Sequence, residues 1–403
     1  MKMISKIRNI IVIAGLVVAI LMPLIFSCFK NVEPLNGVSN TADISELTLS
    51  GKTAAADTAA TTLSPNFLDG SAQSVLEDYV TENIPGRAPM IRLRNQAIYS
   101  VFDKSTNDKT LLLKDGYIFE KSFLYRYEKL LGPTPESDIR AQLDYLDALQ
   151  DELEARGKKL FIFITPSKPR YTEAKVTDIY KESGYYKNLE GGYESLTRIL
   201  ADYDFNVFDG IAYINNLIIT EDPAAQFPLF QPTGTHWCAT IAQKTALAFA
   251  DYMHEVGGYE FPMAEQFIVP TPDPIFPDAD IYDAMNILRP AKGNYFSSNL
   301  IVTEDIDPSL KANALMRGCS FMGQSLASLI AAGFFNDETY MENTMCRTNK
   351  LADINYFNDY SEIDLESYLD KADMVIIEIN EAHVHDIGMR MPKYIMEHKE
   401  VLK

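Results

Sequence analysis

Hydrophobic residues gather along the chain in short runs, separated by longer segments of mixed polarity. A short apolar run that ends at Pro, Gly or a polar residue is typical of a strand buried on both faces of a sheet. Four such runs stand out: KKLFIFITP (158–166), FNVFDGI (205–211), ANALMRG (312–318) and ADMVIIEIN (372–380). We expect each of them to form a strand.

Helical periodicity fills the intervals between these strands. Leucines recur at helical spacing over 137–157, where Gly157 ends the helix, and similar stretches lie at 193–204, 238–256 and 323–335. Strands that alternate with helices predict an α/β fold, a doubly wound, mostly parallel sheet flanked by helices. In such sheets the ligand binds beyond the carboxyl ends of the strands.

Two smaller elements are expected before the first of these strands. Residues 71–102 have a helical pattern in two pieces, broken at Pro85-Gly86. Residues 109–120 are typical of a hairpin, because Asp115-Gly116 is a preferred turn sequence between apolar residues.

A basic flank precedes a long apolar segment near the N-terminus. Lys2, Lys6 and Arg8 come before Ile10–Phe29, which is long enough to cross a bilayer as a helix. The flank predicts that the chain after this segment lies outside the cytoplasm. For residues 1–30 three interpretations stay open: an uncleaved signal anchor in the cell membrane, a lipoprotein signal with lipidation at Cys28, and a cleaved signal peptide.

Residues 31–66 are rich in Ala, Thr and Ser and almost free of large apolar residues. This composition predicts a flexible linker between the membrane and a folded domain at 67–403.

Charge and cysteine content exclude several classes of function. The net charge is 36 minus 56, or −20, which argues against nucleic acid or anionic lipid as a partner. The four cysteines form no CxxC pair, so neither a disulfide scaffold nor a structural zinc site is expected. His383 and His385 could bind a metal together with Asp386, but a pair of this kind is more often a solvated surface. We therefore predict no metal.

Two residues at predicted strand ends have the chemistry of a nucleophile and its base. Ser320 follows the run 312–318 and precedes a helix, whose dipole and N–H groups favour a developing oxyanion. His236 lies just before the helix at 238–256 and could reach Ser320. Each alone is more often a helix cap.

Taken together, several segments resemble the alginate O-acetyltransferases of the AlgX and AlgJ type. QPTGTHWCATIAQKTALAF (231–249) is similar to their D-x-H-W motif, and MRGCSFMGQSL (316–326) is similar to their later G-D-S-F motif. Three supporting segments match the opening helix, the glycine hairpin and the P-x-K strand end, at 78–102, 112–120 and 161–171.

The resemblance implies an SGNH-hydrolase-like fold with permuted motif order, the histidine motif coming before the serine motif. It implies an extracytoplasmic enzyme that transfers acetyl groups to polysaccharide hydroxyls, and a membrane-bound O-acyltransferase partner that supplies them. Ser320 would be the nucleophile, with its own N–H in the oxyanion hole, and His236 would be the base. No cofactor is implied.

Two positions depart from the family's motifs. Gly234 stands where the histidine motif has its aspartate, and Cys319 where the serine motif has one. Without an orienting acid, turnover in a Ser-His-Asp triad falls about 10⁴-fold. Glu378 and Glu381 are the candidates for a replacement acid; a backbone carbonyl or a threonine next to Gly234 is the alternative. A disulfide between Cys238 and Cys319 and a Cys319 nucleophile are further alternatives.

Substrate contacts are expected from the strand end TPSKPRY and from the histidine motif. Lys168 and Arg170 could meet an acidic sugar or the acyl carbonyl, and Tyr171 and Trp237 could stack on a sugar ring. Solvated cations and rings that cover the core are the alternatives.

Three functions from different classes remain. The first is O-acyl transfer to a cell-surface polysaccharide, and the second is a polysaccharide esterase with the same Ser320–His236 pair. The third is a catalytically weak polysaccharide-binding or scaffold protein, because Gly234 replaces the motif aspartate.

Overall fold

A computed structural model describes residues 87–182, 186–221 and 227–402. The predicted anchor or signal at 1–30 with Cys28, the linker at 31–66 and the first helical piece before Pro85 lie outside these residues. Within the described part, every helix is too short or too polar to cross a membrane. The chain divides into two compact units: Met1–Asp108 with Tyr282–Pro290, and Lys109–Ile281 with Ala291–Lys403.

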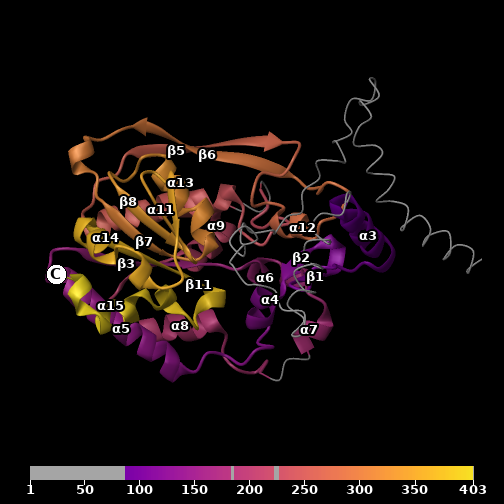
Figure 1. Ribbon diagram of the computed structural model, residues 1–403, viewed down its shortest axis with the longest axis horizontal. Coiled ribbons are helices and arrows are strands. Elements are labelled where there is room, and N and C mark those ends of the chain that lie inside the picture. The colour runs from indigo at the N-terminus through magenta and orange to yellow at the C-terminus, as the bar shows by residue number, and fades with distance from the viewer. Residues whose placement is uncertain (1–86, 183–185, 222–226, 403) are drawn as a thin grey trace, which may run out of the picture. The chain divides into compact units, whose positions relative to one another are not determined.

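A seven-stranded sheet organises the second unit, in the order β10-β9-β8-β7-β11-β3-β4 (Figure 1). The five strands from β8 to β4 are parallel to one another, and β9 and β10 form an antiparallel edge. This confirms the predicted mostly parallel sheet. The strands are β3 (Lys159–Thr165), β4 (Asn206–Asp209), β7 (Ala314–Gly318), β8 (Glu338–Glu342), β9 (Met345–Thr348), β10 (Asp353–Tyr356) and β11 (Met374–Asn380).

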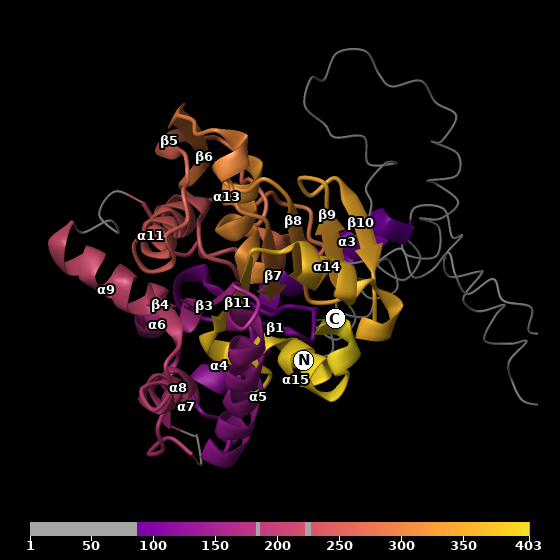
Figure 2. The ribbon, with the colours of Figure 1, turned by 90° about the vertical axis from the view of Figure 1, so that its left-hand side faces the viewer.

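Alternation along the central strands builds a core on each face of the sheet. In β3, Leu160 and Ile162 pack into one core and Phe161 and Phe163 into the other. Helices therefore cover both faces (Figure 2), which explains why these strands are apolar at nearly every position. One face holds α5 (Glu136–Glu154), α8 (Gly192–Leu200), α14 (Leu365–Lys371) and α15 (Met391–Glu397), and the other holds α9 (Gly210–Thr220), α11 (Ala239–Gly257) and α13 (Leu326–Ala331).

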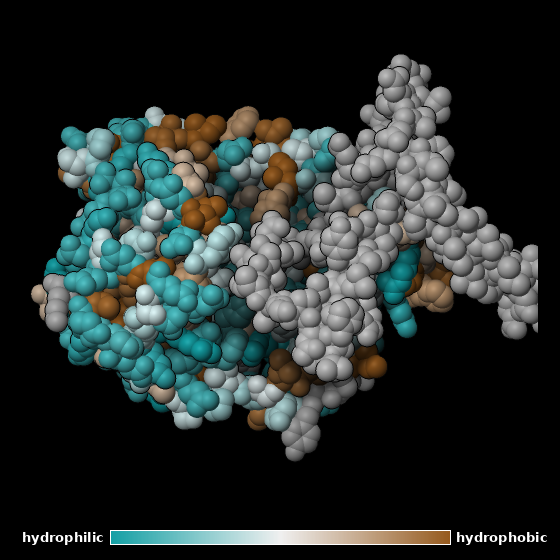
Figure 3. Space-filling view, in the orientation of Figure 1, coloured by the Kyte–Doolittle hydropathy of each residue, from teal (hydrophilic) through white to brown (hydrophobic). Residues whose placement is uncertain are grey.

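A long antiparallel ribbon was not expected from the sequence. Its strands are β5 (Met263–Thr271) and β6 (Tyr295–Glu304), and they pack against α11. One face stays open to solvent, so that Met263, Phe267 and Ile301 are exposed; brown side chains mark this ribbon along the top of Figure 3.

Short elements gather near the carboxyl edge of the sheet. They include the predicted hairpin, β1 (Thr110–Leu112) and β2 (Ile118–Glu120), whose turn residues Asp115 and Gly116 have φ of 57° and 75°. Positive φ at both positions explains the Asp-Gly sequence. The short helices are α4 (Lys121–Tyr127), α6 (Lys168–Tyr171) and α7 (Asp178–Glu182).

The first unit holds α3 (Arg87–Phe102), the second piece of the predicted helical segment. Asn95 Nδ2 on this helix donates to the carbonyl of Met285 at 2.9 Å, and Arg92 donates to that of Ile287 at 3.0 Å. These bonds join α3 to residues 282–290 of the same unit. The helix α12 (Asp280–Ala284) leads into that segment.

Candidate active site

Ser320 lies at the carboxyl end of β7, where the chain turns into a 3₁₀ segment, Ser320–Gln324. The turn is tight because Gly318 lets a neighbouring side chain approach: a Cβ on Gly318 would lie 2.5 Å from a carboxylate oxygen of Glu378. Ser320 itself is half-buried. The predicted strand-to-helix turn is therefore present, with its hydroxyl at the sheet edge where ligands bind.

His236 reaches Ser320 from the loop before α11. The distance between His236 Nε2 and Ser320 Oγ is 2.7 Å, which is a short hydrogen bond. The next residue holds this loop in place, since the buried indole of Trp237 donates from Nε1 to the carbonyl of Phe321 at 3.0 Å. The two sequence motifs are thus joined by one hydrogen bond between their polar residues and another between their neighbours.

Asp280 supplies the carboxylate that contacts His236 on the side opposite Ser320, at the other ring nitrogen, and the sequence did not indicate it. Its Oδ2 lies 2.6 Å from His236 Nδ1, and its Oδ1 accepts from the backbone N–H groups of Thr235 at 2.8 Å and Ile281 at 2.7 Å. An ionised carboxylate can only accept, so Nδ1 carries the proton and Nε2 presents its lone pair to Ser320. This is the tautomer that a general base requires.

Gly234 now has a structural explanation. A Cβ at this position would lie 2.8 Å from the carbonyl oxygens of both Pro277 and Asp278. The segment that carries Asp280 therefore occupies the space next to residue 234, and only glycine leaves room for it. The acid that the resembling motif has two residues before its histidine is provided here from the start of α12.

Neither residue predicted to be the orienting acid takes that role. Glu378 is buried and accepts from Thr165 Oγ1, from the Cys319 N–H at 2.8 Å and from Cys319 Sγ at 3.5 Å. Burial raises its pKa to about 7. Glu378 thus binds the turn before Ser320, and its hydrogen bonds go to Thr165 and Cys319 and not to His236.

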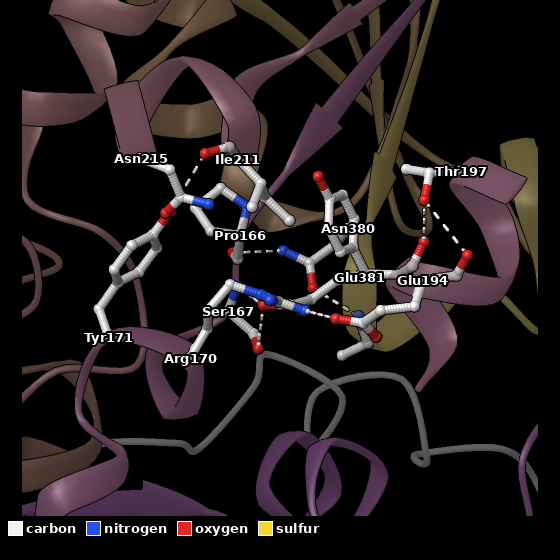
Figure 4. A network of polar contacts seen from close by, with 12 residues as sticks. Pro166, Ser167, Arg170, Tyr171, Glu194, Thr197, Ile211, Asn215, Asn380 and Glu381 are labelled. Atoms are coloured by element: carbon white, nitrogen blue, oxygen red, sulfur yellow. Dashed lines mark hydrogen bonds and ion pairs between the residues drawn. The ribbon is translucent and has the colours of Figure 1, made fainter. Parts of the chain in front are cut away.

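Glu381 belongs to a second network (Figure 4). One carboxylate oxygen accepts from the N–H of Ser167 at 2.7 Å and from its hydroxyl at 2.8 Å, and the other accepts from Arg170 Nε at 2.7 Å. Burial raises the pKa of Glu381, and the Arg170 guanidinium opposes that change. The prediction that Glu378 or Glu381 orients His236 is therefore corrected: Asp280 has that position.

The cysteine alternatives do not fit the structure either. Cys319 is buried, its thiol faces Glu378, and burial raises its pKa well above the usual value. A neutral, buried thiol is a poor nucleophile. Cys238, Cys319 and Cys346 are all free, so the Cys238–Cys319 disulfide is absent from the described part of the chain.

Two of the four predicted substrate contacts are buried structural residues. Lys168 is 3% exposed, and its Nζ donates to the carbonyls of Ile118, Pro232 and Gly234 at 2.6, 2.9 and 2.7 Å. Burial lowers its pKa to about 7. Trp237 is fully buried. Lys168 therefore connects hairpin β1–β2 to the loop of His236, and neither side chain is available to a substrate.

The other two predicted contacts, Arg170 and Tyr171, remain partly exposed. Tyr171 stacks on Phe230 and donates to Asn215 Oδ1 at 3.2 Å (Figure 4). Arg170 lines a cleft of 510 Å³ at the carboxyl ends of β3 and β11. Ser320, His236 and Asp280 do not line this cleft.

The histidine pair of the last strand end has no metal-binding geometry. Burial lowers the pKa of His383 to about 4, and its ring meets Phe123 edge-on. His385 Nε2 lies 3.0 Å from Arg126 Nη2. Over the residues that the structure describes, no group of three His, Cys, Asp or Glu side chains is arranged to hold a metal ion.

Comparison with known proteins gives a family match over part of the chain. Residues 118–273 match the family model described as an SGNH hydrolase-like domain of the acetyltransferase AlgX. This stretch includes β3, β4 and His236 and ends before Asp280 and Ser320. No curated protein matches the chain.

Three solved structures are similar. The O-acetyltransferase domain of Pseudomonas putida AlgJ is 14% identical over 72% of this chain and 98% of that one, with a TM-score of 0.47. Pseudomonas aeruginosa AlgX is 14% identical over 70% of this chain and 65% of that one, with a TM-score of 0.43. Bacillus cereus PatB1 is 10% identical over 68% of this chain and 97% of that one, with a TM-score of 0.46. Over residues 118–273, the chain is therefore similar to the SGNH hydrolase-like domain of the acetyltransferase AlgX.

Proposed function

We propose that the protein transfers an O-acyl group, acetyl in the first instance, to hydroxyl groups of an extracellular or cell-wall polysaccharide. The observation that carries this proposal is the unbroken hydrogen-bonded chain from Asp280 through His236 to Ser320. The family match adds the expectation of acetyl transfer.

In the first half of the reaction, Ser320 Oγ attacks the carbonyl carbon of the acyl donor while His236 Nε2 takes its proton. Asp280 stabilises the imidazolium that forms, through the short bond to Nδ1. The backbone N–H of Ser320 is our candidate for one oxyanion donor. Collapse of the tetrahedral intermediate breaks the bond to the leaving alcohol, which receives the proton from Nε2, and leaves an acyl-serine.

The second half reverses these roles. A sugar hydroxyl gives its proton to His236 Nε2 and attacks the acyl-serine, and the imidazolium then returns the proton to Ser320 Oγ. The products are an O-acyl sugar and free enzyme. An esterase would run the same steps with water as the acceptor, so the two activities differ in whether water is kept from the acyl-serine.

Asp280 favours an enzyme over a non-catalytic scaffold protein. The scaffold alternative depended on the loss of the motif acid at Gly234, and the Asp280 carboxylate, 2.6 Å from His236 Nδ1, supplies that group from the start of α12. Nothing in the geometry of the site then requires the protein to be weak in catalysis.

The source of the acyl group and the location of the domain are part of the same proposal. A membrane-bound O-acyltransferase partner hands over the acyl group, and the N-terminal segment holds the domain at the outer side of the membrane. The support for both is the apolar stretch Ile10–Phe29 and the family resemblance.

A covalent trap tests the proposed nucleophile. The full chain is treated with a fluorophosphonate and the modified peptide is identified by mass, for the wild type and for Ser320→Ala and His236→Ala. We expect an adduct on Ser320 that depends on His236. An adduct on another residue, or none in a folded protein, would contradict the mechanism. Incubation with p-nitrophenyl acetate, with and without oligosaccharide acceptors, then separates transfer from hydrolysis by the mass of the sugar product.

A further inference from the structure

Lys168 is a buried cation that the proposed mechanism does not use. Its Nζ donates to three main-chain carbonyls, those of Ile118 at 2.6 Å, Pro232 at 2.9 Å and Gly234 at 2.7 Å. The last two belong to the loop that leads to His236. Only 3% of Lys168 is exposed, so its side chain does not reach a substrate. Any effect of Lys168 on the reaction must therefore pass through the main chain.

One peptide group lies between Lys168 and Asp280. The carbonyl of Gly234 accepts from Lys168 Nζ at 2.7 Å. The N–H of the same peptide group belongs to Thr235 and donates to Asp280 Oδ1 at 2.8 Å. The other oxygen of this carboxylate, Oδ2, lies 2.6 Å from His236 Nδ1. A continuous chain of hydrogen bonds therefore runs from the ammonium group through one peptide group to the carboxylate and the imidazole.

We propose that Lys168 is a positioning residue for the triad, and that it acts on Asp280 through the Gly234–Thr235 peptide group. This inference rests on the proposed function, because it assigns Lys168 a part in the activation of Ser320. Lys168 orients another residue and is not itself a catalytic residue.

The two charged groups fix the orientation of the peptide group between them. In a planar trans peptide the C=O and the N–H point in opposite directions, so a cation at the oxygen and an anion at the hydrogen favour the same orientation. Hydrogen bonds to charged groups are stronger than neutral ones, and each of the two polarises the peptide group in the sense that strengthens the other. The position of Asp280 Oδ1 is thereby fixed, and with it that of Oδ2 at His236.

The bonds of Lys168 match its protonated form. An ammonium group has three N–H donors, and three carbonyls accept them, whereas a neutral amine has only two. Burial lowers the pKa of Lys168 to about 7, and the Asp280 carboxylate opposes this change. The charges of the two residues therefore attract each other across the peptide group.

A double-mutant cycle between Lys168 and Asp280 distinguishes this role from a purely structural one. The rate at which a fluorophosphonate labels Ser320 is measured in the full chain for the wild type, Lys168→Met, Asp280→Asn and the double variant. Circular dichroism identifies a temperature at which all four proteins are folded. If Lys168 only stabilised the fold, its effect on the labelling rate would not depend on Asp280.

The expected effect of Lys168→Met depends on the residue at position 280. In the wild-type background it should slow labelling roughly 100-fold, which is the cost of misplacing a catalytic group by about 1 Å. In the Asp280→Asn background the same substitution should change the rate by less than about threefold. An equal effect in both backgrounds, or a wild-type rate for Lys168→Met, would overturn the inference.

Lys158→Met is the matched control. Lys158 Nζ also donates to three main-chain carbonyls, those of Leu369, Asp370 and Ala372, at 2.9, 2.6 and 2.7 Å. This lysine comes directly before β3, at the opposite end of the strand from Lys168. Its substitution should lower the stability and leave the labelling rate unchanged. Equal slowing by Lys158→Met and Lys168→Met would show that lost stability, and not the position of Asp280, explains the effect.

A second variant tests the inference even where Lys168→Met does not fold. Lys168→Gln keeps an uncharged donor and should slow labelling at least about tenfold in the wild-type background and less than about threefold in the Asp280→Asn background. The wild type separates this inference from the proposed function. An absent adduct on wild-type Ser320 refutes the catalytic mechanism and the inference with it, whereas normal labelling of both the wild type and the Lys168 variants refutes the positioning role alone.

Discussion

Asp280→Asn is the substitution that tests the triad most directly. The amide of asparagine has the shape of the carboxylate. In the wild type, Asp280 Oδ1 accepts hydrogen bonds from the N–H groups of Thr235 and Ile281, and the amide oxygen can accept the same two bonds. Those two bonds fix the orientation of the amide, so that its NH₂ group takes the place of Oδ2, 2.6 Å from His236 Nδ1 in the wild type. A donor at this place forces the proton of the neutral ring onto Nε2.

The expected loss follows from that tautomer. With a proton on Nε2, the ring cannot accept the proton of Ser320, and the Asp280 carboxylate no longer stabilises the imidazolium. Neutralisation of a triad aspartate costs about 10⁴ in turnover, which corresponds to about 5 kcal/mol of transition-state stabilisation. The free energy of unfolding should change by only about 1 kcal/mol, because the backbone bonds remain.

The assay is the rate at which a fluorophosphonate labels Ser320 in the full chain, supported by hydrolysis of p-nitrophenyl acetate. Glu378→Gln and Glu381→Gln are the comparison variants, and Asp283→Asn, an exposed carboxylate three residues after Asp280, is the matched control. A labelling rate for Asp280→Asn within about fivefold of the wild type would refute the reasoning. So would a larger loss in Glu378→Gln, since that residue does not touch His236.

Three further substitutions test how the site is built. Gly234→Ala places a Cβ 2.8 Å from the carbonyl oxygens of Pro277 and Asp278 and should slow the labelling of Ser320 roughly 100-fold. Gly323→Ala is the control, because its Cβ would have no atom within 4 Å, and it should leave the labelling rate unchanged. Equal labelling rates for the two variants would contradict this explanation of Gly234. The folded-state pKa of Glu378, about 7, lies above the usual 4.5, so its contribution to stability is complete below pH 4.5 and is lost as pH rises through 7. Urea unfolding at a series of pH values should show this loss, at most about 3 kcal/mol, in the wild type and not in Glu378→Gln. The same dependence of the free energy of unfolding on pH in both proteins would rule out this role of Glu378. Lys168→Met leaves three buried carbonyls without their donor and should lower the free energy of unfolding by roughly 3 kcal/mol. Thermal melting measures this effect. An unchanged melting temperature would show that Lys168 contributes little to the stability of the fold.

The apolar runs were sufficient to locate β3, β7 and β11, because a strand buried on both faces needs hydrophobic residues at nearly every position. They also located β4, at the edge of the sheet, whose residues are half-buried. The strands β8 to β10 and the ribbon β5–β6 were missed. In β5 and β10, polar and apolar side chains alternate or mix because one face or one edge meets water, and local periodicity does not separate such segments from loops. The strand β8 is buried, but its sequence, ETYME, contains two glutamates and a threonine and so has no apolar run.

Some residues of the site could likewise be identified from the sequence, and others only from the structure. Sequence alone indicated Ser320 and His236, since each stands in a motif next to a predicted element boundary, and it indicated that the acid was missing at Gly234. Only the tertiary structure brings Asp280 to His236, from the start of α12, 44 residues further along the chain. It also turns Glu378 and Glu381 towards other partners and buries Lys168 among carbonyls. Local sequence encodes where strands and helices begin and end, but which side chains meet at a sheet edge depends on how distant segments pack there. A carboxylate in such a segment carries no local signal of its partner.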